Sequence, residues 1–394
     1  MRKMIKEDKT FIKLRVLESL RFGLVPEYYI DKLTIGFERI EEVTKKILKK
    51  CESFLPVGFQ VCGEYGCGKS HTLSVMRYIA RKEGFITLKA EVDGESISLA
   101  NPLKLMNVLL LSIQDNGIYS DYPWTSLFLK ALLLKNSNFG KLKNFDTIQR
   151  YLNVTSALAD TNLLEEYSHF VESLFLCSDE VSATDVNKML ANVLRYSGYY
   201  DLKLKTPISR KVDERYLDFI ETLAGIAILV SAAGYKGLMV TIDEYEVERI
   251  KNPSNYKIVQ DALRIIGRYL NGNINIPKSP LCIVFAAINQ GGEKGDPDIT
   301  RYISTTHESI FEVSKWADYQ KIELLKKLHS LYCETYQLRT EFSLNTGENL
   351  TKLIESKLPD NESRQIRSVI KWYLSLMDMK YGPPQKVGDL QNGQ

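Results

Sequence analysis

The sequence predicts an α/β fold in which helices cover both faces of a parallel sheet. Two observations carry this prediction. Short apolar runs, rich in β-branched and aromatic residues, recur along the chain, and amphipathic helical patterns separate them. Runs that are nonpolar throughout are typical of strands covered on both faces, and alternating strands and helices produce a parallel sheet between helical layers.

Four apolar runs predict the strands of this sheet. Each run is short and ends near glycine, proline or charged residues, as strands of a sheet commonly do. They are VGFQVC at 57–62, GFITLKAEV at 84–92, GLMVTI at 237–242 and LCIVFAAI at 281–288.

Three helical patterns connect these runs. The first covers 70–84, with apolar residues on one stripe and Gly84 as its stop. The second covers 213–234 and leads into the third strand. The third covers 254–272, and we expect it to begin at Ser254 as N-cap and to end in an Asn-Gly turn.

The chain divides into a core with helical additions. Two helical patterns fill the first fifty residues, separated by glycines that suit a helix stop or a turn. The expected division is an N-terminal helical segment at 1–50, a core at 51–313 with a helical insertion at about 100–206, a helical lid at 314–380 and a disordered polar tail at 381–394.

Composition excludes several classes of protein. The chain has 394 residues, 44% of them hydrophobic, yet no apolar run approaches the ~20 residues that span a bilayer. The N-terminus has no signal-peptide pattern, so we expect a cytoplasmic protein without membrane contact. The six cysteines form no C-x-x-C pair, which favours reduced thiols over a zinc site or disulfides. The net charge of +3 neither favours nor excludes a polyanionic partner.

The stretch GEYGCGKS meets the pattern G-x-x-x-x-G-K-[ST] between a predicted strand and a predicted helix. Its glycines allow the backbone to wrap around phosphate oxygens, and the following helix adds a positive dipole. The sequence therefore predicts a P-loop that binds a nucleoside triphosphate. The expected binding residues are Gly63, Glu64, Tyr65, Gly66, Cys67, Gly68, Lys69, Ser70 and His71.

Two residues of this loop have predicted chemical roles. Lys69 would bridge the β- and γ-phosphates, and the hydroxyl of Ser70 would take one coordination position of Mg²⁺. A chance glycine-rich turn is the alternative, but the flanking strand and helix disfavour it.

Two acids follow the third predicted strand. Asp243 and Glu244 stand where the carboxyl end of a parallel strand opens onto the ligand crevice. We expect Asp243 to reach Mg²⁺ through water and Glu244 to orient or deprotonate the attacking water. Adjacent acids suit an ATPase better than a phosphotransferase. A strand that merely exits to solvent is the alternative interpretation.

Three further polar residues are candidate site residues. Asn289, followed by Gln290, ends the fourth strand, where it would contact the γ-phosphate or the attacking water. Arg364 lies in the first turns of a predicted helix, where positive charge is unfavourable for the helix dipole, and would act from a lid. Arg301 would act as an arginine finger across a subunit interface. A strand-to-loop transition and ordinary surface arginines are the alternatives.

Together these segments resemble the ATP-binding protein family of bacteriophage exclusion (BREX) systems, within the AAA+-like P-loop ATPases of the initiator type. The matching stretches are VLESLRFGLVP, IGFERIEEV, GEYGCGKSHTL, LVSAAGYKGLMVTIDEYE, LCIVFAAINQ and NESRQIRSVIKWY. The resemblance implies an ATPase with the sheet order of AAA+ modules, a helical lid, oligomerisation and a role in defence against invading DNA. One departure is Ile288, where related proteins carry a small hydroxyl residue.

The leading hypothesis is a Mg²⁺-dependent ATPase that assembles or remodels a DNA-linked defence complex. The expected partners are ATP, further copies of the chain or other defence proteins, and DNA, directly or through those proteins. Two alternatives remain open. One is a nucleotide-gated scaffold with little turnover, and the other is an initiator-like clamp on DNA, which the basic first fifty residues support.

Overall fold

The computed structural model describes most of the chain and divides it into two compact units. The sheet unit consists of Glu41–Cys62 and Met76–Glu312, and the terminal unit consists of Met1–Ile40, Gly63–Val75 and Val313–Gln394. The described residues are 9–26, 28–115, 124, 127, 211–251, 253–289, 294–304, 306–342, 348, 349, 352 and 366–381.

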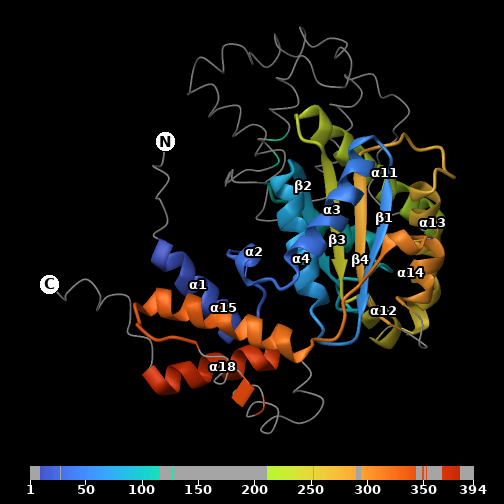
Figure 1. Ribbon diagram of the computed structural model, residues 1–394. Coiled ribbons are helices and arrows are strands. Elements are labelled where there is room, and N and C mark those ends of the chain that lie inside the picture. The colour runs from blue at the N-terminus through green and yellow to red at the C-terminus, as the bar shows by residue number, and fades with distance from the viewer. Residues whose placement is uncertain are drawn as a thin grey trace, which may run out of the picture. The chain divides into compact units, whose positions relative to one another are not determined.

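The described part of the sheet unit contains one five-stranded sheet (Figure 1). Its order is β2-β3-β4-β1-β5, and the pairs β1 with β5, β2 with β3 and β3 with β4 are parallel. The strands are β1 (Val57–Gly63), β2 (Phe85–Glu91), β3 (Gly237–Asp243), β4 (Leu281–Ile288) and β5 (Ile310–Glu312).

The apolar runs form strands because both faces of the sheet are covered. Every residue of β3 except Asp243 is buried, as is every residue of β4 except Ile288. The four predicted strands are confirmed. The sequence did not reveal β5, because its three residues Ile310–Glu312 are too few to show a periodicity.

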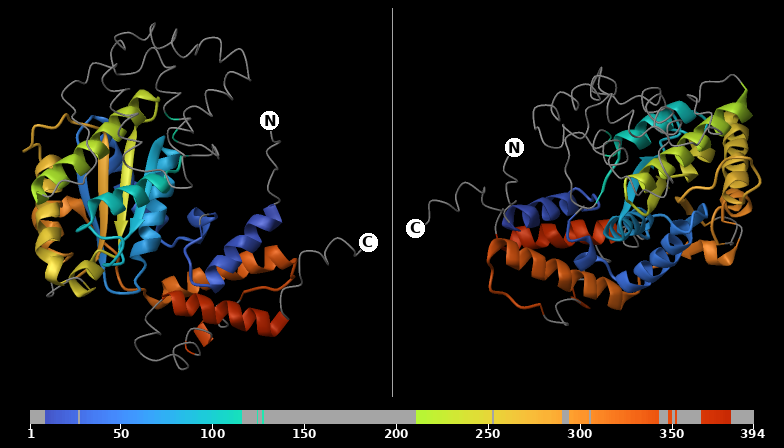
Figure 2. Two further views of the ribbon diagram at one scale, coloured as in Figure 1. Left: turned by 180° about the vertical axis from the view of Figure 1, so that it is seen from behind. Right: turned by 90° about the horizontal axis from the view of Figure 1, so that it is seen from above.

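Helices flank the sheet, which confirms the predicted α/β class. Figure 2 shows α5 and α11 over one face of the strands and α3 and α4 over the other. The helical elements of this part are α3 (Phe37–Glu52), α4 (Lys69–Lys82), α5 (Pro102–Leu111), α11 (Val212–Ala232), α12 (Glu246–Lys251), η1 (Pro253–Asn255), α13 (Tyr256–Leu270), α14 (Pro297–Tyr302) and η2 (His307–Ser309).

One predicted helix start is wrong. The pattern at 254–272 placed Ser254 at the N-cap, but residues Pro253–Asn255 form a 3₁₀ turn and the α-helix starts at Tyr256. Proline fixes φ at a value that suits such a turn, and short 3₁₀ pieces are common at helix N-termini. The predicted stop at Gly84 is confirmed, because its φ is 89° and its N–H bonds to the carbonyl of Arg81.

The terminal unit joins helical segments from both ends of the chain. Its described helices are α1 (Lys9–Arg21), α2 (Ile30–Leu33), α15 (Asp318–Tyr336) and α18 (Ile366–Tyr381), and α1, α15 and α18 lie side by side (Figure 1). Leu17, Leu325 and Leu374 are fully buried in the apolar core between these three helices.

Polar contacts add directional bonds to this helical core. The guanidinium of Arg21 donates through Nε and Nη2 to both carboxylate oxygens of Asp378, at 2.9 and 2.8 Å. Tyr332 donates its hydroxyl to the same carboxylate at 2.7 Å. The N-terminal helix is therefore tied to the last described helix by a bidentate ion pair, the strongest geometry for such a contact.

Several predicted segments lie outside the described residues. Of the helical insertion at about 100–206, the structure describes α5 and a few flanking residues, and beyond them only Trp124 and Leu127. The polar tail at 381–394 is described only at Tyr381. The division into a lid and an insertion therefore stays a prediction.

Candidate functional site

The candidate phosphate loop, residues 63–70, has the strand-loop-helix context that its pattern requires. β1 ends at Gly63, and α4 begins at Lys69. Gly66 and Gly68 have φ values of 75° and 109°, in the region that favours glycine. A Cβ at Gly63 would lie 2.6 Å from the sulfur of Cys67 and 2.8 Å from a carbonyl oxygen of Val313. The backbone therefore accounts for all three glycines of this stretch, the two that the pattern requires and Gly66.

Lys69 turns back over its own loop. Its side chain starts at the first residue of α4, and only 8% of the residue is exposed. The ammonium donates to the carbonyl oxygens of Glu64 at 3.2 Å and Gly63 at 3.5 Å. Ser70 follows it in the first turn of the helix. A cation held over a loop that ends in helix N–H groups fits a phosphate group.

Contacts within the terminal unit hold this loop from outside. The indole N–H of Trp316 donates to the carbonyl of Cys67 at 2.9 Å, and Lys315 pairs with Glu64 at 2.7 Å. Burial raises the pKa of the Cys67 thiol, which opposes its ionisation even though Lys69 is close. Tyr65 is 69% exposed. The segment before α15 therefore supports the loop from outside, although none of its residues belongs to the loop's sequence pattern.

His71 contacts the N-terminal segment of the same unit. Its Nε2 lies 2.8 Å from the hydroxyl of Thr34, which itself donates to the carbonyl of Ile30 at 2.5 Å. Because that hydroxyl has one proton, Nε2 of His71 is the donor and the ring is the Nε2–H tautomer. Desolvation lowers the pKa of His71 to about 4. The imidazole is therefore neutral near pH 7.

The two acids stand at the carboxyl end of β3. Asp243 is the last residue of the strand, and Glu244 follows with a φ of 59°. The backbone N–H of Glu244 donates to the Asp243 carboxylate at 2.9 Å. A non-glycine residue in the left-handed region costs about 1–2 kcal/mol, so the surrounding contacts must enforce this turn. Both residues are only partly buried.

Asn289 follows β4, the neighbour of β3 in the sheet. Its amide N–H donates to Glu312 at 3.4 Å, and its carbonyl oxygen accepts the backbone N–H of Gly295 at 3.0 Å. Glu312 ends β5 and also pairs with Lys294 at 3.0 Å. Asn289 is thus held from both sides at the same edge of the sheet as Asp243, because β3 and β4 are parallel.

Both arginine assignments stay predictions. Arg301 is exposed on α14, and its guanidinium lies over the ring of Tyr302, 5.4 Å from the centroid. Arg364 lies outside the described residues, as does Gln290. Nothing in the described residues assigns either arginine to a nucleotide.

The predicted site residues fall into two groups. The phosphate loop belongs to the terminal unit, whereas Asp243, Glu244 and Asn289 belong to the sheet unit. Sequence reasoning missed the residues that support each group, such as Trp316 and Glu312. No motif marks them, because they come from distant parts of the chain.

Comparison with known proteins supports the predicted family. Residues 9–108 match the family model of the BREX system ATP-binding protein BrxC/D. The resemblance to this family is confirmed over those residues. The matched stretch includes α1, the phosphate loop and β2. The family's description points to ATP binding in a phage-defence system. No curated protein and no solved structure matches the chain.

Among the described residues, no helix combines the length and apolar character that crossing a membrane requires.

Proposed function

We propose that this protein is a Mg²⁺-dependent ATPase that drives the assembly or remodelling of a DNA-linked, anti-phage defence complex. The observation that carries the proposal is the loop at 63–70, where Lys69 and the first turn of α4 follow a buried strand. The match of residues 9–108 to an ATP-binding family supports it.

The loop residues fit a triphosphate by their chemistry. The carbonyl oxygens of Gly63 and Glu64 now accept the Lys69 ammonium, and phosphate oxygens are stronger acceptors for the same cation. A Cβ at Gly68 would meet no atom within 4 Å, so open space lies beside the backbone there. Lys69 would bind the β- and γ-phosphates, and Ser70 would provide a ligand for Mg²⁺.

The acids of β3 would serve the same nucleotide. Asp243 would hold Mg²⁺ through water, and Glu244 would orient or deprotonate the attacking water. The sheet order supports this assignment, because β4 alone separates β1 from β3. Mg²⁺ supplies charge neutralisation when bound.

Three further residues have proposed roles at the nucleotide. Asn289 would contact the γ-phosphate or the attacking water, Arg364 would act from a lid formed by the C-terminal helices, and Arg301 would act across a subunit interface. We further propose a AAA+-like module that oligomerises in the cytoplasm with its own copies or other defence proteins, and that reaches DNA directly or through them.

Glu244→Gln tests the proposal against a nucleotide-gated scaffold. The amide keeps the size of the side chain but cannot take a proton, so we expect ATP affinity to stay within a few-fold and phosphate release to fall by about 100-fold or more. The matched control is Glu91→Gln, because Glu91 ends β2 and pairs in register with Asp243. Equally slow phosphate release by the wild type and both variants would favour the scaffold.

A salt titration tests the initiator-like clamp. Binding that rests on phosphate contacts must weaken steeply as salt rises. The lysines of α3 that would form a basic face pair with acids in the same unit, Lys45 with Glu41 at 2.9 Å and Lys46 with Glu308 at 3.2 Å. We therefore expect weak, shallow salt dependence for the isolated protein. A steep slope for duplex DNA would favour the clamp.

A further inference from the structure

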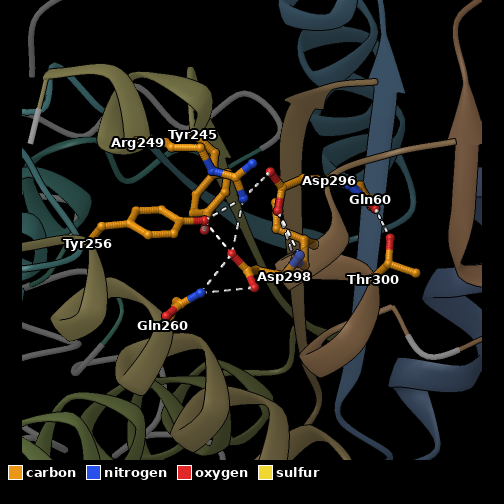
Figure 3. Close-up of polar contacts among 9 residues, drawn as sticks. Gln60, Tyr245, Arg249, Tyr256, Gln260, Asp296, Asp298 and Thr300 are labelled. Atoms are coloured by element: carbon orange, nitrogen blue, oxygen red, sulfur yellow. Dashed lines mark hydrogen bonds and ion pairs between the residues drawn. The ribbon is translucent and has the colours of Figure 1, made fainter. Parts of the chain in front are cut away.

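A polar cluster in the sheet unit connects the segment that follows Glu244 with the segment that follows Asn289. We call it the Asp298 cluster, and Figure 3 shows how its side chains converge. Its members come from α12, α13 and the N-terminal end of α14. They are Arg249, Tyr256, Gln260, Asp296 and Asp298.

Asp298 is the centre of this cluster. Its carboxylate accepts hydrogen bonds from Arg249 at 3.1 Å, from Gln260 at 3.2 and 3.3 Å, and from the Tyr256 hydroxyl (Figure 3). Arg249 also donates to the Tyr256 oxygen at 2.6 Å. The tyrosine hydroxyl thus accepts from the guanidinium and donates to the carboxylate. Three elements meet at one anionic group.

Asp296 gives the cluster a second, deeper carboxylate. Its side chain is 1% exposed, lies 3.4 Å from Arg249 and accepts the backbone N–H groups of Asp298 and Ile299 at 2.9 and 3.2 Å. Burial raises the pKa of Asp296, while the charge of Arg249 opposes that shift. One guanidinium therefore faces two carboxylates, and removal of it would leave buried negative charge without its cation.

One residue, Gly295, connects the cluster to Asn289. Gly295 precedes Asp296, and its backbone N–H donates to the Asn289 side chain at 3.0 Å. A Cβ at Gly295 would lie 2.5 Å from the amide oxygen of Gln60, so this backbone also packs closely on β1. The position of Asn289 therefore depends on the segment that Arg249 holds.

The helix α12 connects the cluster to Glu244. This helix begins two residues after Glu244, and Arg249 lies within it. The same helix is also held by Glu248, a fully buried residue whose carboxylate accepts the Ser98 hydroxyl at 2.8 Å and the backbone N–H of Leu99. Two consecutive residues thus anchor α12, and these contacts can enforce the left-handed turn at Glu244.

We infer that Arg249 and Asp298 are positioning residues that hold the Glu244 turn and Asn289 in one fixed arrangement for ATP hydrolysis. The inference rests on the proposed function, because it assigns a purpose to the arrangement of those two residues. Neither Arg249 nor Asp298 touches the nucleotide in this account. They act through the backbone of α12 and of residues 295–298.

The test measures ATP affinity, kcat and KM for Arg249→Gln and Asp298→Asn. A displacement of about 1 Å at a reacting group costs up to about 100-fold in rate. We expect kcat to fall roughly 10- to 100-fold, while ATP affinity and KM stay within a few-fold of the wild type, because the phosphate loop is unchanged. Arg249→Lys keeps the charge but loses the planar guanidinium, whose Nη2 contacts Tyr256, Asp296 and Asp298, so it should rescue only part of kcat.

The matched control is Arg264→Gln. Arg264 lies on α13 and also pairs with two aspartates, Asp213 at 3.2 Å and Asp261 at 3.3 Å. These two carboxylates are 65% and 33% exposed, whereas the partners of Arg249 are 1% and 13% exposed. We expect the kcat of Arg264→Gln to stay at the wild-type value. If either main variant fails to fold, Tyr256→Phe removes one hydroxyl from the cluster and should lower kcat about three- to ten-fold.

Amide hydrogen exchange separates this inference from the proposed function. Exchange of residues 243–251 should be faster in Arg249→Gln than in the wild type and unchanged in Arg264→Gln. Wild-type protein without ATPase activity would contradict the proposed function alone. Wild-type kcat in Arg249→Gln and Asp298→Asn, or unchanged exchange at 243–251, would overturn the positioning role.

Discussion

The phosphate loop and the carboxylate edge of β3 are built in different ways. The loop takes its shape mainly from its own residues, since glycines at three positions and the start of α4 define its backbone. The edge of β3 instead depends on distant residues, because a left-handed Glu244 is enforced only where α12 is held from outside. Local sequence thus encodes the first region, and tertiary contacts encode the second.

Removal of the lysine of the loop should have the largest effect. Lys69→Ala deletes a cation expected to bond two phosphates, each bond being worth about 1.5–3 kcal/mol, so ATP affinity should fall by about 100-fold or more. Calorimetric titration with Mg-ATP measures this. Lys104→Ala, at an exposed position on α5, is the control and should bind normally. Unchanged ATP affinity in Lys69→Ala would show that Lys69 and its loop do not bind the phosphates.

The close approach of α13 and α14 should give the next effect. A Cβ at Gly267 would lie 2.1 Å from the carbonyl oxygen of Tyr302. Gly267→Ala should therefore lower the free energy of unfolding by about 2–3 kcal/mol, despite alanine's better helix propensity. Gly272→Ala is the comparison. A Cβ at Gly272 would meet no atom within 4 Å, so only the backbone φ of 72° disfavours alanine there. It should cost about 1 kcal/mol.

If denaturant unfolding gave the two glycine variants equal stability, the packing of α13 on α14 would differ from this structure. The support for the Asp298 cluster would then weaken as well, since the cluster lies between the same helices.

The neutral His71 predicts a pH dependence of stability in the terminal unit. Its pKa is lowered from 6.5 to about 4, so between these values the unfolded chain binds a proton that the folded chain does not. Stability must fall as pH falls through this window, by about 2 kcal/mol between pH 7 and pH 5 for this group. His71→Gln should lose that part of the dependence, measured as the difference between the two unfolding curves.

A His71→Gln variant with the full wild-type slope between these pH values would show that His71 is not the desolvated group. Other histidines contribute equally to both proteins, so the difference isolates this residue.

The smallest effect concerns the outer support of the loop. Trp316→Phe removes one hydrogen bond to the Cys67 carbonyl, worth about 0.5–1.5 kcal/mol, so ATP affinity should fall about two- to ten-fold. The wild-type emission spectrum should also change when ATP binds, and the change should be absent in Trp316→Phe. The same spectral change in both proteins would assign the signal to another tryptophan.

The sequence predicted the features that depend on neighbouring residues. The four longer strands follow from apolar runs, and the loop follows from the spacing of Gly63, Gly68 and Lys69. It did not predict β5, because three residues carry no pattern. Nor did it predict that α1 packs with α15 and α18, because the pattern of an amphipathic helix does not show which other element covers its apolar face.

The supports of the site were likewise beyond sequence reasoning. Trp316 lies 249 positions from Cys67, and Asp298 lies 49 positions from Arg249. The positive φ of Glu244 also left no signal, because a glutamate rarely adopts it without tertiary contacts.

The central claim is that the phosphate loop and the acids of β3 serve one bound nucleotide. A double-mutant cycle for Mg-ATP affinity with Ser70→Ala and Asp243→Asn tests it most directly. If both residues hold the same Mg²⁺, the double variant should lose less affinity than the sum of the single losses, by more than about 0.5 kcal/mol. Strictly additive losses would contradict a shared metal ion, and with it the proposed ATPase site.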